Sequence, residues 1–356
     1  MKVGICTQPL TTNYGGILQN YALQTILKRL GHKVWTIDYF RFNWLDWFVH
    51  ILKTLIHKLL GHDRSFGNTP IAQANLEKPL RRFVDRYISL TKPRTKFYER
   101  SVVCKYGFEA VIVGSDQVWR PNYNPHIEKS FLSFTKNLNI KRVAYAASFG
   151  TDKWEFDVKQ SSLCIPLAQQ FDAISVRENS GIMLCEDYLH VKAEHVLDPT
   201  LLLKSDDYFQ LCADIEKKKP FIFAYILDAS NQKVDEIRKF AESKGLEYFI
   251  MSAGPQVKEN DSVEQWLSYF RDAKYIITDS FHGTAFSINF GKEFYVFGNK
   301  QRGNSRFSSL LGLLGLQNRI LQDSIVEQNE IDWNSVFQKL DDERSRCIEW
   351  LTKSLK

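Results

Sequence analysis

Hydrophobic and polar positions follow each other along the chain in two alternating patterns. Short apolar runs rich in Val, Ile and Phe predict buried strands. Between them, runs with apolar residues at every third or fourth position predict amphipathic helices. Such an alternation is typical of βαβ units around a mainly parallel sheet, so the predicted fold class is α/β.

The predicted elements form two series. The first has strands at residues 2–7, 33–39, 110–113, 143–147, 173–176 and 195–197, with a helix at 17–30 that Gly31 ends. The second has strands at 221–227, 247–251, 275–278 and 294–297, with helices at 233–244, 263–273 and 285–289. We therefore predict two Rossmann-like domains, residues 1–216 and 217–356, joined near Lys217-Lys218-Lys219-Pro220, the second ending in a C-terminal helix. Ligands are expected in the cleft between their strand ends.

One stretch, residues 40–106, interrupts this pattern and predicts an inserted helical segment. It also holds the charge excess: the whole chain carries +6, whereas residues 41–106 hold 13 basic and 5 acidic side chains. A nonspecific nucleic-acid binder would be basic throughout, so no nucleic-acid partner is predicted.

The front of this insert, residues 40–60, places aromatic and aliphatic side chains beside basic ones. Trp44, Trp47 and Phe48 accompany Lys53 and Lys58. A helix of this kind suits peripheral contact with an anionic membrane surface. The alternative is that its aromatic side chains pack on the protein's own domain or on a second subunit.

The sequence does not support secretion, a membrane-spanning segment, or a bound metal or cofactor. The six cysteines are scattered without a CxxC pair, no stretch resembles a signal peptide, and no run of 18 apolar residues occurs. The expected location is the cytoplasm, with peripheral contact at the inner face of the cytoplasmic membrane as the hypothesis for residues 40–60. Without HExxH, P-loop or GxGxxG patterns, neither a tightly bound metal nor a tightly bound cofactor is predicted.

Polar residues gather directly after the predicted strands. The turn Asn13-Tyr14-Gly15-Gly16 would let the backbone approach an anion at a helix N-terminus, although a plain strand-to-helix turn is the alternative. After residues 110–113 and 143–147 come the candidate cleft residues Ser115, Asp116, Gln117, Trp119 and Ser148.

Two further side chains have sharper chemistry. Arg177, after residues 173–176, offers a planar fork for phosphate or carboxylate, or pairs structurally with Glu178 or Asp198. His282 follows a strand end and precedes Gly283 and Thr284, which suits a general acid or base. The basic loop at 299–306 is either an anion clamp or a solvated loop.

Six ordered blocks resemble those of the polysaccharide pyruvyl transferase family over roughly residues 3–315. They are the segments at 13–16, 114–119, 148–150, 175–178, 197–200 and 279–283. The resemblance implies a two-domain architecture like that of the GT-B glycosyltransferases. It further implies phosphoenolpyruvate as co-substrate, and as acceptor a hexose of a bacterial surface polysaccharide or its lipid-linked precursor.

The resemblance also implies residue roles: His282 is the catalytic residue and Arg177 a donor ligand. The family often has Arg-Leu before this histidine, where this chain has Ser280-Phe281, so Arg302 or Arg306 is expected to supply the missing charge. The remaining expected donor ligands are Ser280, Gly283 and Thr284, and the expected acceptor or cleft residues are Asn13, Tyr14, Gly15, Gly16, Ser115, Asp116, Gln117, Trp119 and Ser148. A nucleotide-sugar glycosyltransferase and a non-catalytic glycan-binding protein are the alternative functions.

Overall fold

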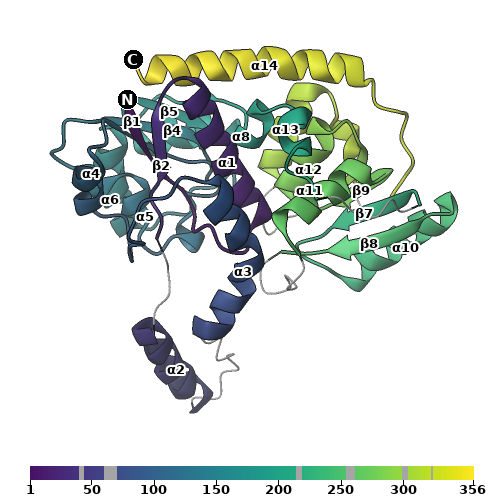
Figure 1. Cartoon of the computed structure of the whole chain (residues 1–356), viewed down its shortest axis with the longest axis horizontal. Coiled ribbons are helices and arrows are strands. Elements are labelled where there is room, and N and C mark those ends of the chain that lie inside the picture. Colours follow the sequence, from purple (N-terminus) through teal and green to yellow (C-terminus); the bar gives the residue numbers. More distant parts are fainter. Residues whose placement is uncertain (40–43, 60–69, 214–218, 254–260, 299–303, 322–323) are drawn as a thin grey trace.

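A computed structural model describes residues 1–39, 44–59, 70–213, 219–253, 261–298, 304–321 and 324–356 (Figure 1). The described chain contains a six-stranded sheet of order β2-β1-β3-β4-β5-β6 and a five-stranded sheet of order β11-β10-β9-β7-β8. All paired strands run parallel. The predicted α/β class with two Rossmann-like sheets is confirmed.

The strands follow the apolar runs closely. The first sheet consists of β1 (Lys2–Cys6), β2 (Lys33–Thr36), β3 (Ala110–Val113), β4 (Lys141–Ala147), β5 (Ala173–Val176) and β6 (Glu194–His195). The second consists of β7 (Phe221–Tyr225), β8 (Glu247–Met251), β9 (Tyr275–Thr278), β10 (Glu293–Phe297) and β11 (Ile320–Leu321). Every residue of β3 is buried, as expected of a central parallel strand with helices on both faces.

Helices cover both sheets and join their ends. The longer ones are α1 (Tyr14–Arg29), α2 (Trp44–Leu59), α3 (Pro70–Tyr87), α6 (Val158–Ala168), α10 (Asn231–Lys244), α11 (Val263–Asp272), α12 (Phe281–Asn289), α13 (Ser305–Leu314) and α14 (Trp333–Ser354). Shorter ones include α4 (Arg100–Tyr106) and α8 (Pro199–Leu202). None of the described helices is long and apolar enough to cross a bilayer.

Helices α1, α10 and α12 begin earlier than predicted because a polar side chain caps each of them. The Asn13 side chain accepts a hydrogen bond from the N–H of Gly16 at 3.1 Å, and the Ser280 side chain accepts one from the N–H of Gly283 at 3.3 Å. The expectation that the last of these helices begins at residue 285 was therefore wrong. His282 lies inside the first turn of α12, not before it.

The described parts of the predicted insert at 40–106 contain the helices α2, α3 and α4, and residues 88–99 between α3 and α4 are not helical. Helix α2 stands apart from both sheets (Figure 1). Of the predicted hinge, Lys217 and Lys218 lie outside the described residues, as does the candidate donor ligand Arg302.

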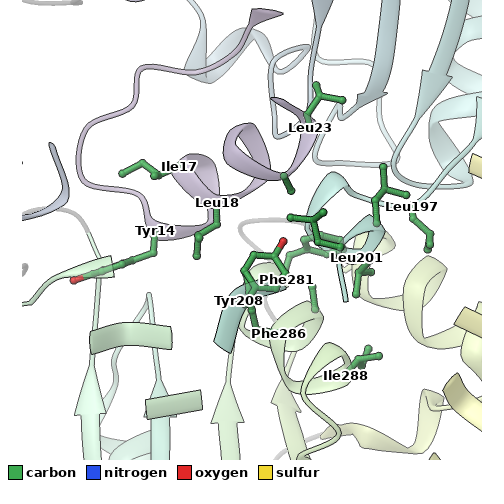
Figure 2. Packing of buried hydrophobic residues seen from close by; sticks show 14 of the residues in the cluster. Tyr14, Ile17, Leu18, Leu23, Leu197, Leu201, Tyr208, Phe281, Phe286 and Ile288 are labelled. Carbon is green, nitrogen blue, oxygen red and sulfur yellow. The ribbon is translucent and has the colours of Figure 1, made fainter. Parts of the chain in front are cut away.

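One apolar cluster joins the two sheets. Side chains of α1, α8 and α12 gather in it (Figure 2), and Leu201 of α8 is fully buried there. Tyr14 of α1 stacks on Trp266 of α11, with ring centroids 5.5 Å apart and planes at 8°. Because the two halves share this core, burial that stabilises one half also stabilises the other.

Helix α14 returns from the second sheet and lies across both halves (Figure 1). The Arg344 guanidinium donates to the carbonyl oxygens of Leu201 and Leu203 and to the side-chain oxygen of Asn289. The N–H of Leu197 contacts Cys347 Sγ at 3.2 Å. The C-terminal helix thereby fixes the segment that follows β6.

Replacing Leu201 tests this shared core. We expect Leu201→Ala to lower the free energy of unfolding by about 2–5 kcal/mol, because it leaves a cavity where both halves pack. The control Leu163→Ala, at a side chain 45% exposed on α6, should change it by about 0.5 kcal/mol or less. Urea titration followed by tryptophan fluorescence and circular dichroism measures both variants. Equal, small effects would contradict the role of Leu201.

Candidate functional site

The site is built where the strand order reverses in each sheet. In the first sheet this point lies between β1 and β3, and in the second between β7 and β9. Ligands in open α/β sheets bind outside the strand ends at such points. The segments that follow β3 and β9 carry Asp116 and His282, so the predicted polar blocks occupy these positions.

Asp198, directly before α8, is the residue on which these segments converge. One carboxylate oxygen, Oδ1, caps α8 by accepting from the N–H and hydroxyl of Thr200. The other, Oδ2, accepts from Arg177 Nη1 at 2.9 Å and Ser115 Oγ at 2.9 Å. It lies 3.8 Å from His282 Nε2. Burial alone would raise the pKa of Asp198, but His282 and Arg177 outweigh it and hold that pKa below its usual range.

Arg177 is buried and held by two carboxylates. Besides Asp198, its guanidinium faces Asp116 Oδ1 at 3.4 Å. Its Nε has no hydrogen-bond partner among the described residues. The sequence offered two roles for Arg177, a ligand of the substrate anion or a structural ion-pair partner. The ion pair with Asp198 is present, and the buried Nε is still left to donate a hydrogen bond.

Phe281, directly before His282, lies against two arginines. The Arg177 guanidinium carbon is 4.4 Å from the centre of its ring, and that of Arg306 is 5.9 Å away. Both distances fall within the range of cation–π attraction.

Arg306, from α13, brings a second positive charge to the site. Burial, and then the nearby Arg177, lower its pKa to about 10, while Glu178 and Asp116 act in the opposite direction. The guanidinium is still charged at neutral pH. We call Asp116, Arg177, Glu178, Asp198, His282 and Arg306 the Asp198 cluster.

His282 faces this cluster from the second half of the molecule. Burial lowers its pKa, although Asp198 and Asp116 oppose the change, so the imidazole is neutral at pH 7. Its Nε2 has no hydrogen-bond partner among the described residues. A Cβ added at Gly15 would overlap the imidazole and lie 2.6 Å from His282 Cβ, so only glycine fits at the start of α1.

Glu178 holds the turn after β4. Its Oε1 accepts from Ser148 Oγ and from the N–H groups of Phe149 and Gly150, at 2.8–3.1 Å. Its Oε2 is buried and has no partner among the described residues. Burial raises its pKa despite the nearby Arg177, whereas the pKa of His282 is lowered.

The structure brings most predicted site residues together, but several of them make hydrogen bonds that stabilise the fold. Asn13 caps α1 and donates to Asp116 at 3.2 Å, Gly16 donates to Asn13, and Gln117 accepts from Gln8 through its carbonyl. Ser115 and Ser148 are buried and bound to the carboxylates of Asp198 and Glu178.

Five of the expected ligand residues make other contacts in this structure. The side chains of Tyr14 and Trp119 are fully buried: one stacks on Trp266, and the other stacks on Phe131 and donates to the Ser130 carbonyl. The N–H groups of Gly283 and Thr284 already donate to Ser280, whose hydroxyl is thereby used as a cap.

Comparison with protein families decides what the chain is related to. The family model described as polysaccharide pyruvyl transferase matches residues 13–301. The chain belongs to this family. The match supports a transferase acting on polysaccharide, and the six sequence blocks of the pyruvyl transferase family all fall within or beside the cluster described above.

No curated protein matches the chain in sequence. Among solved structures, it is similar to UDP-GlcNAc 2-epimerase of Methanocaldococcus jannaschii in complex with UDP-GlcNAc and UDP. That match has 11% identity and a TM-score of 0.48, covering 97% of this chain and 93% of that one. It is also similar to S. aureus MnaA with UDP (10%, TM-score 0.49, covering 99% and 91%). A third is the glycosyltransferase SsfS6 of Streptomyces sp. SF2575 (9%, TM-score 0.37, covering 97% and 96%).

Sequence reasoning missed the central place of Asp198 and Glu178 in this pyruvyl transferase family member. Both residues stand in the matched blocks, but were considered only as structural partners of Arg177. The available signal was their position: each acidic residue directly follows a strand or its terminal turn, at the sheet edge that carries the other polar groups.

A double-mutant cycle tests the contact between Gly15 and His282. We expect Gly15→Ala to lower the free energy of unfolding by about 1–3 kcal/mol, because the new methyl group overlaps the imidazole. In a His282→Gly background most of this loss should disappear, since the opposing side chain is gone. Thermal and urea unfolding of the four proteins give the coupling.

Gly312→Ala is the matched control, because a Cβ there meets only Gln317 at 3.7 Å. It should be neutral or mildly stabilising in both backgrounds. A Gly15→Ala loss of the same size with and without the His282 side chain would contradict the proposed overlap.

Proposed function

We propose that this protein transfers the pyruvyl group of phosphoenolpyruvate to two hydroxyls of a hexose in a bacterial surface polysaccharide or its precursor, forming a cyclic ketal. One observation carries the proposal. Arg177 and His282 both face Asp198 Oδ2, and the buried atoms Arg177 Nε and His282 Nε2 lack hydrogen-bond partners among the described residues. Arg177 Nε is suited to bind an anionic substrate, and His282 Nε2 is suited to accept a proton from a hydroxyl group.

Phosphoenolpyruvate carries a phosphate and a carboxylate, and the cluster offers two arginines for them. Arg177 lies close enough to Arg306 to lower the pKa of Arg306. An added anion between them relieves this repulsion and strengthens both contacts. Because Arg177 already faces Asp116 and Asp198, the donor has to exchange with part of this pairing. The longer contact, to Asp116 at 3.4 Å, is the one more easily given up.

Ketal formation requires two additions at the enol carbon. A proton goes to the methylene carbon, which becomes the methyl group, and one sugar hydroxyl forms a C–O bond to the enol carbon. The C–O bond to phosphate then breaks and the second hydroxyl closes the ring. Of the two hydroxyl protons, one balances the proton that made the methyl group and the other leaves with phosphate.

His282 is suited to the base role in these steps. Its neutral imidazole accepts a hydroxyl proton through Nε2, and Asp198 at 3.8 Å stabilises the imidazolium that forms. Glu178, with its raised pKa, is the nearby carboxyl group that retains a proton most readily. Neither role requires a resident cofactor.

Replacing His282 tests the assignment. We expect His282→Asn to lower kcat about 10²–10⁴-fold with little change in the KM of phosphoenolpyruvate, because the base is lost while the arginines remain. In the unaltered protein, kcat/KM should stay level around pH 7. It should fall only below the pKa of His282, which lies under the usual 6.5, as the imidazole becomes protonated. Both the kinetics of the variant and the pH dependence are measured by phosphate release, with lipid-linked oligosaccharide from a strain lacking the gene as the acceptor.

His190→Asn, at an exposed histidine, is the control and should retain full turnover. Full turnover by His282→Asn would refute the base role. If UDP- or GDP-sugars, and not phosphoenolpyruvate, raise the melting temperature, a nucleotide-sugar glycosyltransferase replaces the proposed function.

We further propose that α2 holds the protein at the inner face of the cytoplasmic membrane, where a lipid-linked acceptor is presented. Its side chains Phe48, Val49, Leu52, Leu55 and Ile56 are 44–60% exposed. At 100° per residue they fall within an arc of about 120°, which Lys53 borders. Inserting this arc into lipid stabilises binding by roughly 1 kcal/mol per side chain, and each nearby basic group adds about as much on anionic lipid.

Vesicle co-sedimentation tests the role of α2. The unaltered protein should pellet with phosphatidylglycerol vesicles and much less with phosphatidylcholine vesicles, because the insert is basic. The triple change Phe48→Ser, Leu52→Ser and Ile56→Ser should abolish pelleting, whereas Leu163→Ser and Met183→Ser, at exposed apolar residues elsewhere, should not. Failure of the unaltered protein to pellet with either vesicle would end the membrane hypothesis.

A further inference from the structure

A second pocket opens on the same edge of the first sheet, outside the Asp198 cluster. It encloses about 180 Å³, and its walls include Tyr39, Phe97, Tyr98, Asn124, His126 and Lys129. Tyr39 follows β2, the Tyr98 hydroxyl donates to the Thr7 carbonyl after β1, and Asn124 donates to the Val118 carbonyl after β3. The pocket therefore lies at the carboxyl ends of these strands, the edge where open α/β sheets bind ligands.

The walls of this aromatic pocket are held in place by contacts among themselves. The rings of Tyr39 and Tyr98 lie 4.5 Å apart, and the ring of Phe97 meets His126 edge to face at 4.7 Å. The Asn124 side chain also donates to Ser130 Oγ at 2.8 Å. These contacts brace the rings against one another around the pocket.

The chemistry of the lining favours a sugar ring over other ligands. Aromatic faces accept the C–H face of a sugar, while His126 and the half-buried Lys129 offer polar atoms to its hydroxyls. Lys129 has no ion pair among the described residues. No carboxylate belongs to the described lining, which disfavours a metal ion. A volume below the roughly 300–1,000 Å³ of drug-sized sites suits one ring rather than a nucleotide.

The position of the pocket separates it from the reacting centre. Tyr39 follows β2 and Arg177 follows β5, which are four strand positions apart in the order β2-β1-β3-β4-β5. At a spacing of about 4.8 Å these two residues are roughly 19 Å apart. On its other side the pocket reaches Asn124, which donates to the Val118 carbonyl after β3, the strand that also precedes Asp116. None of the described lining residues belongs to the Asp198 cluster, so a ring held in the aromatic pocket lies beside the cluster and not in it. Helix α2 begins five residues after Tyr39, at most about 18 Å away along the chain.

We propose that the aromatic pocket is a separate subsite that binds one sugar ring of the acceptor glycan other than the reacting hexose. The identity of this glycan as acceptor rests on the proposed function. Binding at the subsite does not, because it needs neither phosphoenolpyruvate nor His282. Its contacts would hold an extended acceptor in register, so that a second ring of the same chain reaches the Asp198 cluster.

Saturation-transfer NMR with methyl glycosides of glucose, galactose, mannose and N-acetylglucosamine tests the subsite on the full chain without phosphoenolpyruvate. At least one glycoside should bind, and Phe97→Ala and Lys129→Ala should each raise its Kd about three- to tenfold. The matched controls Tyr188→Ala and Lys159→Ala, at an exposed tyrosine and an exposed lysine elsewhere, should leave it unchanged. Lys129→Ala, at a partly exposed side chain, keeps the test decisive if Phe97→Ala does not fold.

Two outcomes overturn the subsite: none of the four glycosides binds, or binding is the same in both pocket variants and the unaltered protein. Turnover separates this proposal from the proposed function. If phosphoenolpyruvate is consumed, the pocket variants should raise the KM of an oligosaccharide acceptor and leave that of phosphoenolpyruvate unchanged. If it is not consumed but the pocket variants still weaken glycoside binding, the subsite stands and pyruvyl transfer falls.

Discussion

The arrangement of the site depends on one buried carboxylate, that of Asp198. It caps the short helix through which the two halves pack, neutralises the central arginine, accepts from the serine after β3 and faces the imidazole from the other half. A buried carboxylate is stable only while such partners surround it. The same contacts that make Asp198 tolerable in the interior therefore set the relative positions of Arg177 and His282. Stability and site geometry cannot be separated at this residue.

This constraint explains why a nearly neutral domain pair can bind a highly charged donor. The Asp198 cluster contains two arginines and three acidic side chains, so its charges are largely compensated before any ligand arrives. In a dry interior, uncompensated guanidinium groups would be costly, and their mutual repulsion is already visible in the lowered pKa of Arg306. Phe281 completes the arrangement with an aromatic ring that lies within cation–π distance of both guanidinium groups. The basic surplus of the chain lies elsewhere, in the inserted helical segment.

The sequence was sufficient for the strands and for the sheet edge at which the site lies, because apolar runs and the polar residues after them are local signals. The sequence could not distinguish residues that line the site from residues that stabilise the fold. Whether Tyr14 and Trp119 line a cleft or fill a core depends on Trp266 and Phe131, which are distant in the chain. The donor groups of Gly283 and Thr284 seemed available only because the helix was expected to begin later, and the Ser280 cap decides that start. Asp198 gained its importance through three partners that no local pattern connects.

The path of α14 has a consequence for how the protein is made. Residues of the last helix close the underside of α8 and the segment after β6, which belong to the first half of the chain. That half therefore cannot complete its packing when its own last residue leaves the ribosome. At roughly 5–20 residues per second, the remaining 140 residues from position 217 take about 7–28 s to synthesise. During this interval the apolar surface around α8 is without its final cover.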